Sequence, residues 1–252
     1  MGRLRALIAV LVLGTTGCAT SGGPTFTLMQ MNLCLSGYSG CDGRASYPAA
    51  VDEAVERIRR ARPDAVTLNE TCRGDVARIA RRVGYHVSFT RVIYAGRLLP
   101  CVRPGGRGLF GDAVLTRAPV ERADAQDFTG QAGPERRRWL CVTTRAADVC
   151  TAHLNTLLPG EAPGNAAQCA ELAELLARRA RSGPVIFGGD VNRRRSCAPH
   201  GAWTRTDASA HQAAGLQQVY GSRALRSPSA RVVRAANTDH DFLLVRARLA
   251  PR

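Results

Sequence analysis

The stretch Pro184-Val185-Ile186-Phe187-Gly188-Gly189-Asp190-Val191-Asn192 joins an apolar segment to a polar one. Residues 184–188 form a short apolar run that is bounded by proline and glycine, which is typical of a buried strand. Asp190 and Asn192 alternate beyond it, so an extended backbone would point both side chains to the same side. An Asx turn that closes the strand is the alternative interpretation. In either case the polar groups lie at a strand end, where catalytic residues concentrate.

Other segments around this stretch carry strand and helix patterns. Apolar residues at 51, 54, 55 and 58 have helical spacing, and Pro63 ends that helix. We also expect helices over 75–83 and 165–181, and strands over 25–33, 64–70, 87–94, 112–117, 139–145, 149–154, 216–222 and 242–249. Helices interspersed among many strands, several of them linked as hairpins, favour an α/β sandwich over a simple parallel stack. Residues 24–252 show no internal repeat or long linker and are expected to form one domain.

The N-terminal segment, residues 1–23, has the pattern of a secretory signal. Arg3 and Arg5 precede the short apolar run 6–13, and small residues follow up to Cys18. The run is too short to span a membrane. Thr16-Gly17-Cys18 suggests lipidation of Cys18, and ordinary cleavage near residues 19–21 is the alternative. We therefore expect an exported protein that is either extracellular or anchored to the outer face of the cell membrane through Cys18.

Nine cysteines fit an oxidising compartment. The eight that follow Cys18 are an even number, and the sequence has no Cys-x-x-Cys pair, so disulfides are favoured over a zinc site. Two local pairs are expected. Cys34 and Cys41 flank a Ser/Gly-rich loop, and Cys141 and Cys150 face each other across a predicted hairpin. The remaining connectivity does not follow from the sequence.

The composition is strongly basic, with 35 Lys+Arg against 20 Asp+Glu. Such a charge attracts polyanions, including nucleic acid and acidic membrane surfaces. Every one of these positive charges is an arginine, because the sequence contains no lysine. A coding bias toward GC-rich codons is therefore an alternative explanation of the charge.

Six polar signatures follow the predicted strands in order: Met31-Asn32, Leu68-Asn69-Glu70, Gly111 to Arg117, Thr151-Ala152-His153-Leu154, Gly188 to Asn192 and Thr238-Asp239-His240-Asp241. The set resembles the endonuclease/exonuclease/phosphatase superfamily over essentially the whole mature chain. The resemblance implies a four-layered α/β sandwich with two packed mixed β-sheets flanked by helices. It also implies hydrolysis of phosphoesters with a divalent metal ion.

The resemblance assigns roles to the residues of these signatures. Asn32, Glu70 and Asp239 are the expected metal ligands, and oxygen donors of this kind suit Mg²⁺, with Mn²⁺ or Ca²⁺ as alternatives. The expected catalytic residues, which orient water and contact the scissile phosphate, are His153, Asp190, Asn192 and His240.

The sequence departs from the family pattern at two positions. The aspartate that orients the final histidine is replaced by Gln217, which could hold a neutral imidazole but would not stabilise an imidazolium as a carboxylate does. Asp112 stands where asparagine is usual, and we interpret it as a turn cap rather than as a further metal ligand.

Two arginine clusters are candidates for contact with phosphate, because guanidinium groups bind phosphate bidentately. Arg193 and Arg194 directly follow Asn192, so contact with a substrate phosphate and a solvated charged surface are equally favoured for 193–195. For Arg136-Arg137-Arg138 we favour the solvated surface.

The function predicted from these observations is metal-dependent phosphodiester hydrolysis, with nucleic acid as the favoured substrate and a monomer as the favoured state. A sphingomyelinase-like or small-metabolite phosphatase activity of the same site is the first alternative. A catalytically weak surface lipoprotein that binds without cleaving is the second, because Gln217 replaces a carboxylate.

Overall fold

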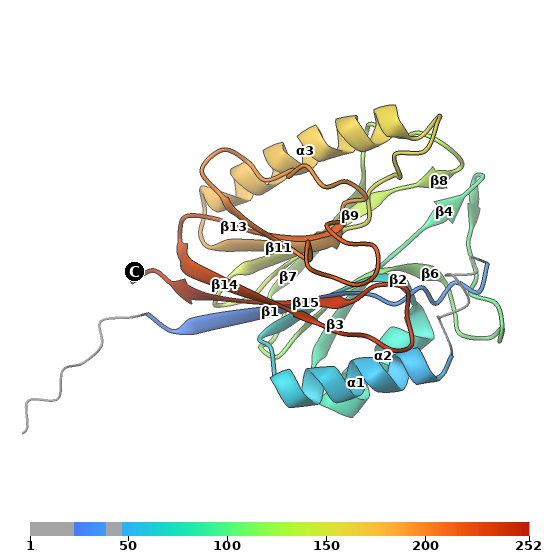
Figure 1. Cartoon of the computed structure of the whole chain (residues 1–252), viewed down its shortest axis with the longest axis horizontal. Coiled ribbons are helices and arrows are strands. Elements are labelled where there is room, and N and C mark those ends of the chain that lie inside the picture. Colours follow the sequence, from blue (N-terminus) through green and yellow to red (C-terminus); the bar gives the residue numbers. More distant parts are fainter. Residues whose placement is uncertain (1–22, 39–46, 252) are drawn as a thin grey trace, which may run out of the picture.

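The computed structural model describes residues 23–38 and 47–251 (Figure 1). Two six-stranded sheets pack face to face, with helices on the outer face of each, so the chain forms four layers. This confirms the expected α/β sandwich. Residues 1–22 of the predicted signal segment, which include Cys18, lie outside the described residues, as does Cys41.

The first sheet has the strand order β14-β15-β1-β2-β6-β3. Strands β1 and β2 are parallel, and the other pairs are antiparallel. The strands span Thr25–Asn32 (β1), Ala65–Cys72 (β2), His86–Arg91 (β3), Phe110–Thr116 (β6), Leu225–Val233 (β14) and Phe242–Leu249 (β15).

The second sheet has the order β12-β13-β11-β10-β9-β7, and β10 and β11 form its parallel pair. The strands span Arg122–Asp127 (β7), Arg138–Thr143 (β9), Asp148–Ala152 (β10), Val185–Asp190 (β11), Trp203–Thr206 (β12) and Gln217–Gly221 (β13). A three-stranded sheet, β5-β4-β8, lies beside the sandwich and consists of Ile93–Tyr94 (β4), Arg97–Leu98 (β5) and Glu135–Arg136 (β8).

Three apolar cores correspond to the three interfaces between layers. Helices α1 (Ala49–Ala61) and α2 (Arg73–Val83) cover the first sheet through residues such as Val55 and Ile79. Leu28 and Ile186 belong to the core between the two sheets. Helix α3 (Ala162–Ala180) covers the second sheet through residues such as Leu172. Burial of these faces provides the main driving force for the fold.

The sequence located most elements but not all of them. The segment 87–94, expected to be one strand, is divided at Val92, and its two parts belong to different sheets. Strands β7, β12 and β14 were not expected. They lie at or next to sheet edges and contain many partly exposed polar residues, so their sequences lack the alternation that marks a strand packed on a core.

Three disulfides join described cysteines: Cys72–Cys101, Cys141–Cys150 and Cys169–Cys197. The predicted pair Cys141–Cys150 is confirmed, and its cysteines are direct partners in the β9–β10 ladder. Cys34 is also disulfide-bonded, but its predicted partner Cys41 is outside the described residues, so that pairing stays a prediction. The other two bonds join distant segments, whose proximity depends on the fold.

No helix in the described part of the chain is long and apolar enough to cross a membrane.

Candidate active site

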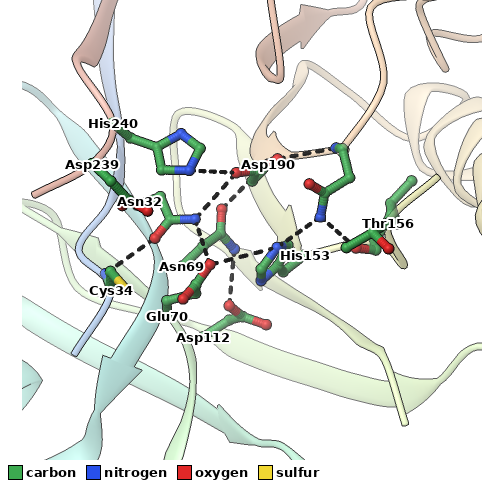
Figure 2. A network of polar contacts seen from close by, with 12 residues as sticks. Asn32, Cys34, Asn69, Glu70, Asp112, His153, Thr156, Asp190, Asp239 and His240 are labelled. Atoms are coloured by element: carbon green, nitrogen blue, oxygen red, sulfur yellow. Dashed lines mark hydrogen bonds and ion pairs between the residues drawn. The ribbon is translucent and has the colours of Figure 1, made fainter. Parts of the chain in front are cut away.

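The expected site residues converge at one edge of the sandwich (Figure 2). Strands β1, β2, β10 and β11 end there, and the loop before β15 reaches the same edge. Six of the seven expected metal and catalytic residues can be located by label in Figure 2: Asn32, Glu70, His153, Asp190, Asp239 and His240. The seventh, Asn192, joins them through hydrogen bonds to His153 and Asp190.

Asn32, fully buried at the end of β1, connects the two sheets. Its Nδ2 donates to Glu70 Oε1 at 2.9 Å and to Asp190 Oδ2 at 3.1 Å. Its Oδ1 accepts the backbone N–H of Cys34 at 3.1 Å, which fixes the orientation of the amide. The Thr238 hydroxyl donates to the backbone oxygen of Asn32 at 3.0 Å and so holds the segment that carries Asp239 beside it.

Glu70 lies within β2 in a left-handed conformation, with φ of 54°. The ladder between β2 and β6 shifts register between Leu68 and Thr71, so Glu70 occupies a bulge. Bulges re-aim side chains next to active sites, and positive φ at a non-glycine residue costs about 1–3 kcal/mol. Desolvation raises the pKa of Glu70 to about 7, and the negative charges of Asp190 and Asp239 add to the effect.

Asp190 and Asn192 form a turn rather than a continued strand. Strand β11 ends at Asp190, Asn192 has φ of 52°, and its N–H donates to Asp190 Oδ1 at 3.0 Å. The expected extended geometry was therefore wrong, and the Asx turn is present. The turn still brings the Asn192 amide into the site, where Nδ2 donates to Leu154 O at 2.9 Å.

The carboxylate of Asp190 is almost completely buried, which by itself opposes ionisation. His240 and hydrogen bonds from Asn192 and Asn32 outweigh that cost, so the pKa of Asp190 is lowered. His240 Nε2 lies 3.5 Å from Asp190 Oδ2. Burial also works against the charged form of His240, but Asp190, Asp239, Glu70 and Asp207 together raise its pKa. Asp190 and His240 therefore form a buried ion pair.

His153 is in the opposite electrostatic state. Burial, reinforced by the positive charge of Arg137, lowers the pKa of His153 to about 3, so the ring is neutral at pH 7. Asn192 Nδ2 lies 2.9 Å from His153 Nε2. Because the same amide donates to Leu154 O, its nitrogen is the donor, and Nε2 of the ring accepts. The proton of the neutral ring is therefore on Nδ1.

Gln217 does not orient His240, contrary to one expectation. Its Oε1 accepts from Gln30 Nε2 at 3.2 Å, and its Nε2 donates to the backbone oxygen of Asp241. Asp207, which follows β12 and is fully buried, is the last of the four carboxyl groups that raise the pKa of His240, after Asp190, Asp239 and Glu70. Within the described residues, Asp207 Oδ2 and His240 Nδ1 are both buried without a hydrogen-bond partner. No sequence signature marked Asp207.

Asp112 does not cap a turn, so that interpretation was also wrong. It lies inside β6, is 3% exposed, and accepts a hydrogen bond from Asn69 Nδ2 at 2.9 Å. Asn69 Oδ1 in turn accepts the backbone N–H of Asp190 at 2.8 Å. Desolvation raises the pKa of Asp112 to about 7. Asp112 thus supports the site through Asn69, from behind the residues that line it.

A cavity of about 520 Å³ opens over these residues. It is lined by Ser36, Tyr38, Glu70, Tyr94, Leu99, Phe110, Glu135, Arg137, His153, Thr156, Asp190, Asn192 and His240. Arg193 and Arg194 do not line it: Arg193 Nη1 donates to Asn165 Oδ1 at 3.2 Å, and Arg194 is exposed. Arg137, which we had placed on a solvated surface, is 6% exposed and lines the cavity, so that interpretation was wrong.

The donor set suits a hard divalent cation. In the described part of the chain, no three His, Cys, Asp or Glu side chains are placed to hold a metal ion by themselves. A cation here would need the Asn32 amide and water beside Glu70 and Asp239, and Mg²⁺ usually keeps several waters in this way. Burial and neighbouring carboxylates raise the pKa of Glu70. A bound cation would offset these effects and favour the ionised form of Glu70.

The two-sheet sandwich thus carries carboxylates, amides and histidines together at one edge. The chain matches the endonuclease/exonuclease/phosphatase family over residues 32–240 and belongs to that family. Members of this family are hydrolases that act on phosphoester bonds and generally depend on divalent metals. A comparison with curated proteins gives no match.

Solved structures share the fold at low sequence identity. The human Nocturnin catalytic domain with bound sulfate has a TM-score of 0.67 and 15% identity, covering 90% of this chain and 94% of that one. An endonuclease/exonuclease/phosphatase protein from Beutenbergia cavernae has a TM-score of 0.64 and 19% identity, covering 90% and 72%. TDP2 from D. rerio, complexed with a single-strand DNA product, has a TM-score of 0.60 and 13% identity, covering 88% and 98%.

Proposed function

We propose that this protein is an exported, Mg²⁺-dependent phosphodiester hydrolase that acts on nucleic acid. The observation that carries the proposal is the bridge made by Asn32, whose amide joins Glu70 to Asp190 beneath an open cavity. This bridge places a candidate metal ligand beside a candidate water-orienting carboxylate, although the two residues come from different sheets.

Different groups at the site would take different roles in hydrolysis. A bound divalent cation would supply positive charge to the phosphoryl oxygens. The ionised Asp190 takes one proton from the attacking water as the water oxygen bonds to phosphorus; the bond from phosphorus to the ester oxygen breaks, and the leaving oxygen takes a proton from solvent. The protonated His240 donates to a phosphoryl oxygen and offsets charge that develops there.

Nucleic acid is favoured as substrate by the basic composition and by a structural relative. The chain carries a formal net charge of +15, which attracts polyanions. D. rerio TDP2, which shares the fold, was solved with a single-strand DNA product. The exposed Tyr38 and Tyr94 line the cavity, and tyrosine rings provide stacking surfaces for bases.

Export is supported by the N-terminal signal pattern and by the disulfides among the described residues. Lipidation at Cys18 would add anchoring to the membrane, and mass spectrometry of the mature N-terminus tests it. A mature chain that begins beyond residue 18 without a lipid would contradict the anchor.

A substrate panel tests the activity. Supercoiled plasmid, single-stranded RNA and sphingomyelin vesicles are incubated with the mature protein and Mg²⁺, with and without EDTA. We expect cleavage of nucleic acid that EDTA abolishes. Release of phosphocholine without any cleavage of nucleic acid would instead support the lipid-directed alternative, and activity on none of the three would favour a binding protein.

A further inference from the structure

The edge of the sandwich opposite the active site is where the chain enters the fold. Strand β1 begins there and runs eight residues to Asn32, a length of roughly 25 Å. Leu249 N donates to Pro24 O at 2.9 Å. The next residue, Ala250, donates its N–H to Ala224 O at 2.7 Å. The first and last described residues therefore lie together at this edge, at the other end of β1 from the active site (Figure 1).

Four exposed arginines at this end of the sandwich form what we call the basic edge: Arg181, Arg223, Arg226 and Arg248. Arg226 and Arg248 are direct partners in the antiparallel β14–β15 ladder, so their side chains share one face of the sheet. Like charges directly opposite each other destabilise a sheet. Within the described residues none of the four forms an ion pair with a carboxylate, whereas Arg117 at the same end of the sandwich pairs with Asp64. An external anion would relieve this repulsion.

The basic edge also contains an apolar cavity of about 250 Å³, between the end of α3 and the turn after β13. Arg181 and Arg223 line it together with apolar side chains such as Leu176, Val185 and Tyr220. Arginines beside apolar surface are complementary to a ligand that has both an anionic group and hydrocarbon, as an anionic phospholipid does. The backbone of a nucleic acid offers the anion without the hydrocarbon.

The predicted lipidation site is close in sequence to this edge. Cys18 precedes Gly23, the first described residue, by five positions, which span at most about 17 Å when fully extended. Gly23 lies directly against the end of β15, since a Cβ added to it would be 1.9 Å from Leu249 O. A lipid on Cys18 would therefore hold the basic edge, rather than the active-site cavity, next to a bilayer.

We propose that the basic edge binds the surface of a bilayer that contains anionic phospholipid. Arg226 and Arg248 contact lipid phosphates, and Arg181 and Arg223 hold a headgroup at the mouth of the apolar cavity. The active site then faces away from the bilayer, toward substrates in solution and away from the lipids of the same bilayer. The inference goes beyond the hydrolysis proposed above and does not rest on it.

Co-sedimentation with vesicles tests the inference. A mature chain that begins at Ala19 keeps every described helix and strand and cannot carry a lipid on Cys18. We expect it to bind phosphatidylcholine vesicles that contain about one-third phosphatidylglycerol, to bind pure phosphatidylcholine weakly, and to be released by high salt. Each arginine near an anionic surface strengthens binding about fivefold, so Arg226→Gln/Arg248→Gln should weaken it about ten- to thirtyfold.

The matched control is Arg194→Gln/Arg195→Gln. It removes the same charge at two exposed positions that follow β11, at the active-site edge. This variant should bind the anionic vesicles within about twofold of wild type. Equal losses in the two double variants would show that only the net charge of the protein matters, and they would overturn the inference.

Stability measurements exclude a merely structural effect. Removing the like-charge pair in Arg226→Gln/Arg248→Gln should leave Tm at or above the wild-type value. A second variant, Arg181→Gln/Arg223→Gln, covers the case in which the first does not fold, and it should lose vesicle binding by a similar factor. Vesicle binding within about twofold of wild type in either folded variant overturns the inference.

Binding of duplex DNA in EDTA, measured with the same variants, separates a membrane from a nucleic acid as the partner. If Arg226→Gln/Arg248→Gln weakens binding of DNA and leaves vesicle binding unchanged, the basic edge is a nucleic-acid surface and the inference fails. Vesicle binding through the basic edge by a protein that cleaves no phosphoester supports the inference and removes the proposed activity. Cleavage of nucleic acid without vesicle binding leads to the reverse conclusion.

Discussion

The space between the two sheets has an apolar half and a polar half, and the same strands line both. The inward-facing residues of β1 begin with Phe26 and Leu28 and continue with Gln30 and Asn32. Side chains two apart share one face of a strand, so the change occurs along a single face. Other strands show the same order toward the site: Ala65, Thr67 and Asn69 in β2, Ile186, Gly188 and Asp190 in β11, and Val219 and Gln217 in β13.

The named residues of the two halves are equally buried, but they contribute differently to stability. Apolar residues of the first half stabilise the sandwich by leaving water. In the polar half, burial has a cost that hydrogen bonds must offset. Gln30 Nε2 donates to Asn69 Oδ1 at 2.7 Å, and the Thr67 hydroxyl donates to Gln30 Oε1 at 2.6 Å. The sandwich therefore carries a preorganised polar network at one edge, supported by the apolar core behind it.

Gly188 marks the boundary between the halves. A Cβ added there would lie 2.4 Å from Thr67 Oγ1, which is closer than packing allows. Gly188 therefore lets β11 approach the opposite sheet, which allows Asp190 to reach Asn32.

The largest expected effect lies in the polar half and concerns activity. His240→Ala removes the cationic partner of Asp190 and should lower kcat on a cleaved phosphodiester by about a thousandfold, as loss of an acid–base group does. His200→Ala is the control, because His200 is exposed and lies outside the site. Equal rates for the two variants would remove His240 from the catalytic residues.

The next effect lies in the apolar half and concerns stability. Ile186 is fully buried between the sheets, so Ile186→Ala should lower the free energy of unfolding by about 3 kcal/mol, measured in urea. Activity per folded molecule should stay close to wild type. Val87→Ala, at a 43% exposed position, should change stability by less than about 0.5 kcal/mol. A large loss of kcat in folded Ile186→Ala would show that the apolar half contributes to activity as well as to stability.

Metal binding should stabilise the polar half specifically. Adding Mg²⁺ to metal-free protein at a hundred times Kd should raise the free energy of unfolding by about 2.7 kcal/mol. Glu70→Gln should reduce this gain strongly, whereas Glu56→Gln, at an exposed position of α1, should not. Thermal unfolding with and without the metal measures both. Equal Mg²⁺ stabilisation of the two variants would exclude Glu70 as a ligand.

A smaller effect depends on pH. Desolvation raises the pKa of Asp207 to about 7 from 3.8, so folding favours its protonated form. Its contribution to stability is fully present below about pH 4 and is lost as pH rises through 7. Asp207→Asn cannot ionise, so relative to wild type it should gain on the order of 2 kcal/mol between pH 4 and pH 8. Denaturant unfolding across this range checks the sign. A constant difference would contradict the raised pKa.

The sequence predicted the site through the order of its signatures and the strands that precede them. Asn32, His153 and Asp190 follow apolar segments whose buried positions are evident from their composition. A strand end is a local property, and the parallel pairs β1–β2 and β10–β11 bring such ends to one edge. The strand ends follow from pattern alone, whereas the choice of these residues as a site came from the resemblance to the family.

The remaining features depend on tertiary structure. The bulge that re-aims Glu70 arises from pairing with β6, so β2 itself carries no signal for it. Arg137 stands between Arg136 and Arg138, and the sequence does not distinguish the three. Arg137 is buried because the chain passes there from the small sheet to the second large sheet. Asp207 follows β12, a strand of four partly exposed residues, and its Oδ1 accepts the backbone N–H groups of Gly215 and Gln217, which come later in the chain.

The central claim is that the polar edge hydrolyses phosphodiesters, and it depends most directly on the charge of Asp190. Asp190→Asn keeps the size of the side chain and an oxygen that can accept from Asn192. Nicking of supercoiled plasmid in Mg²⁺ should fall by about a thousandfold in this variant. Asp52→Asn, at a position whose side chain is 47% exposed, should nick at the wild-type rate. Wild-type nicking by folded Asp190→Asn would contradict the account.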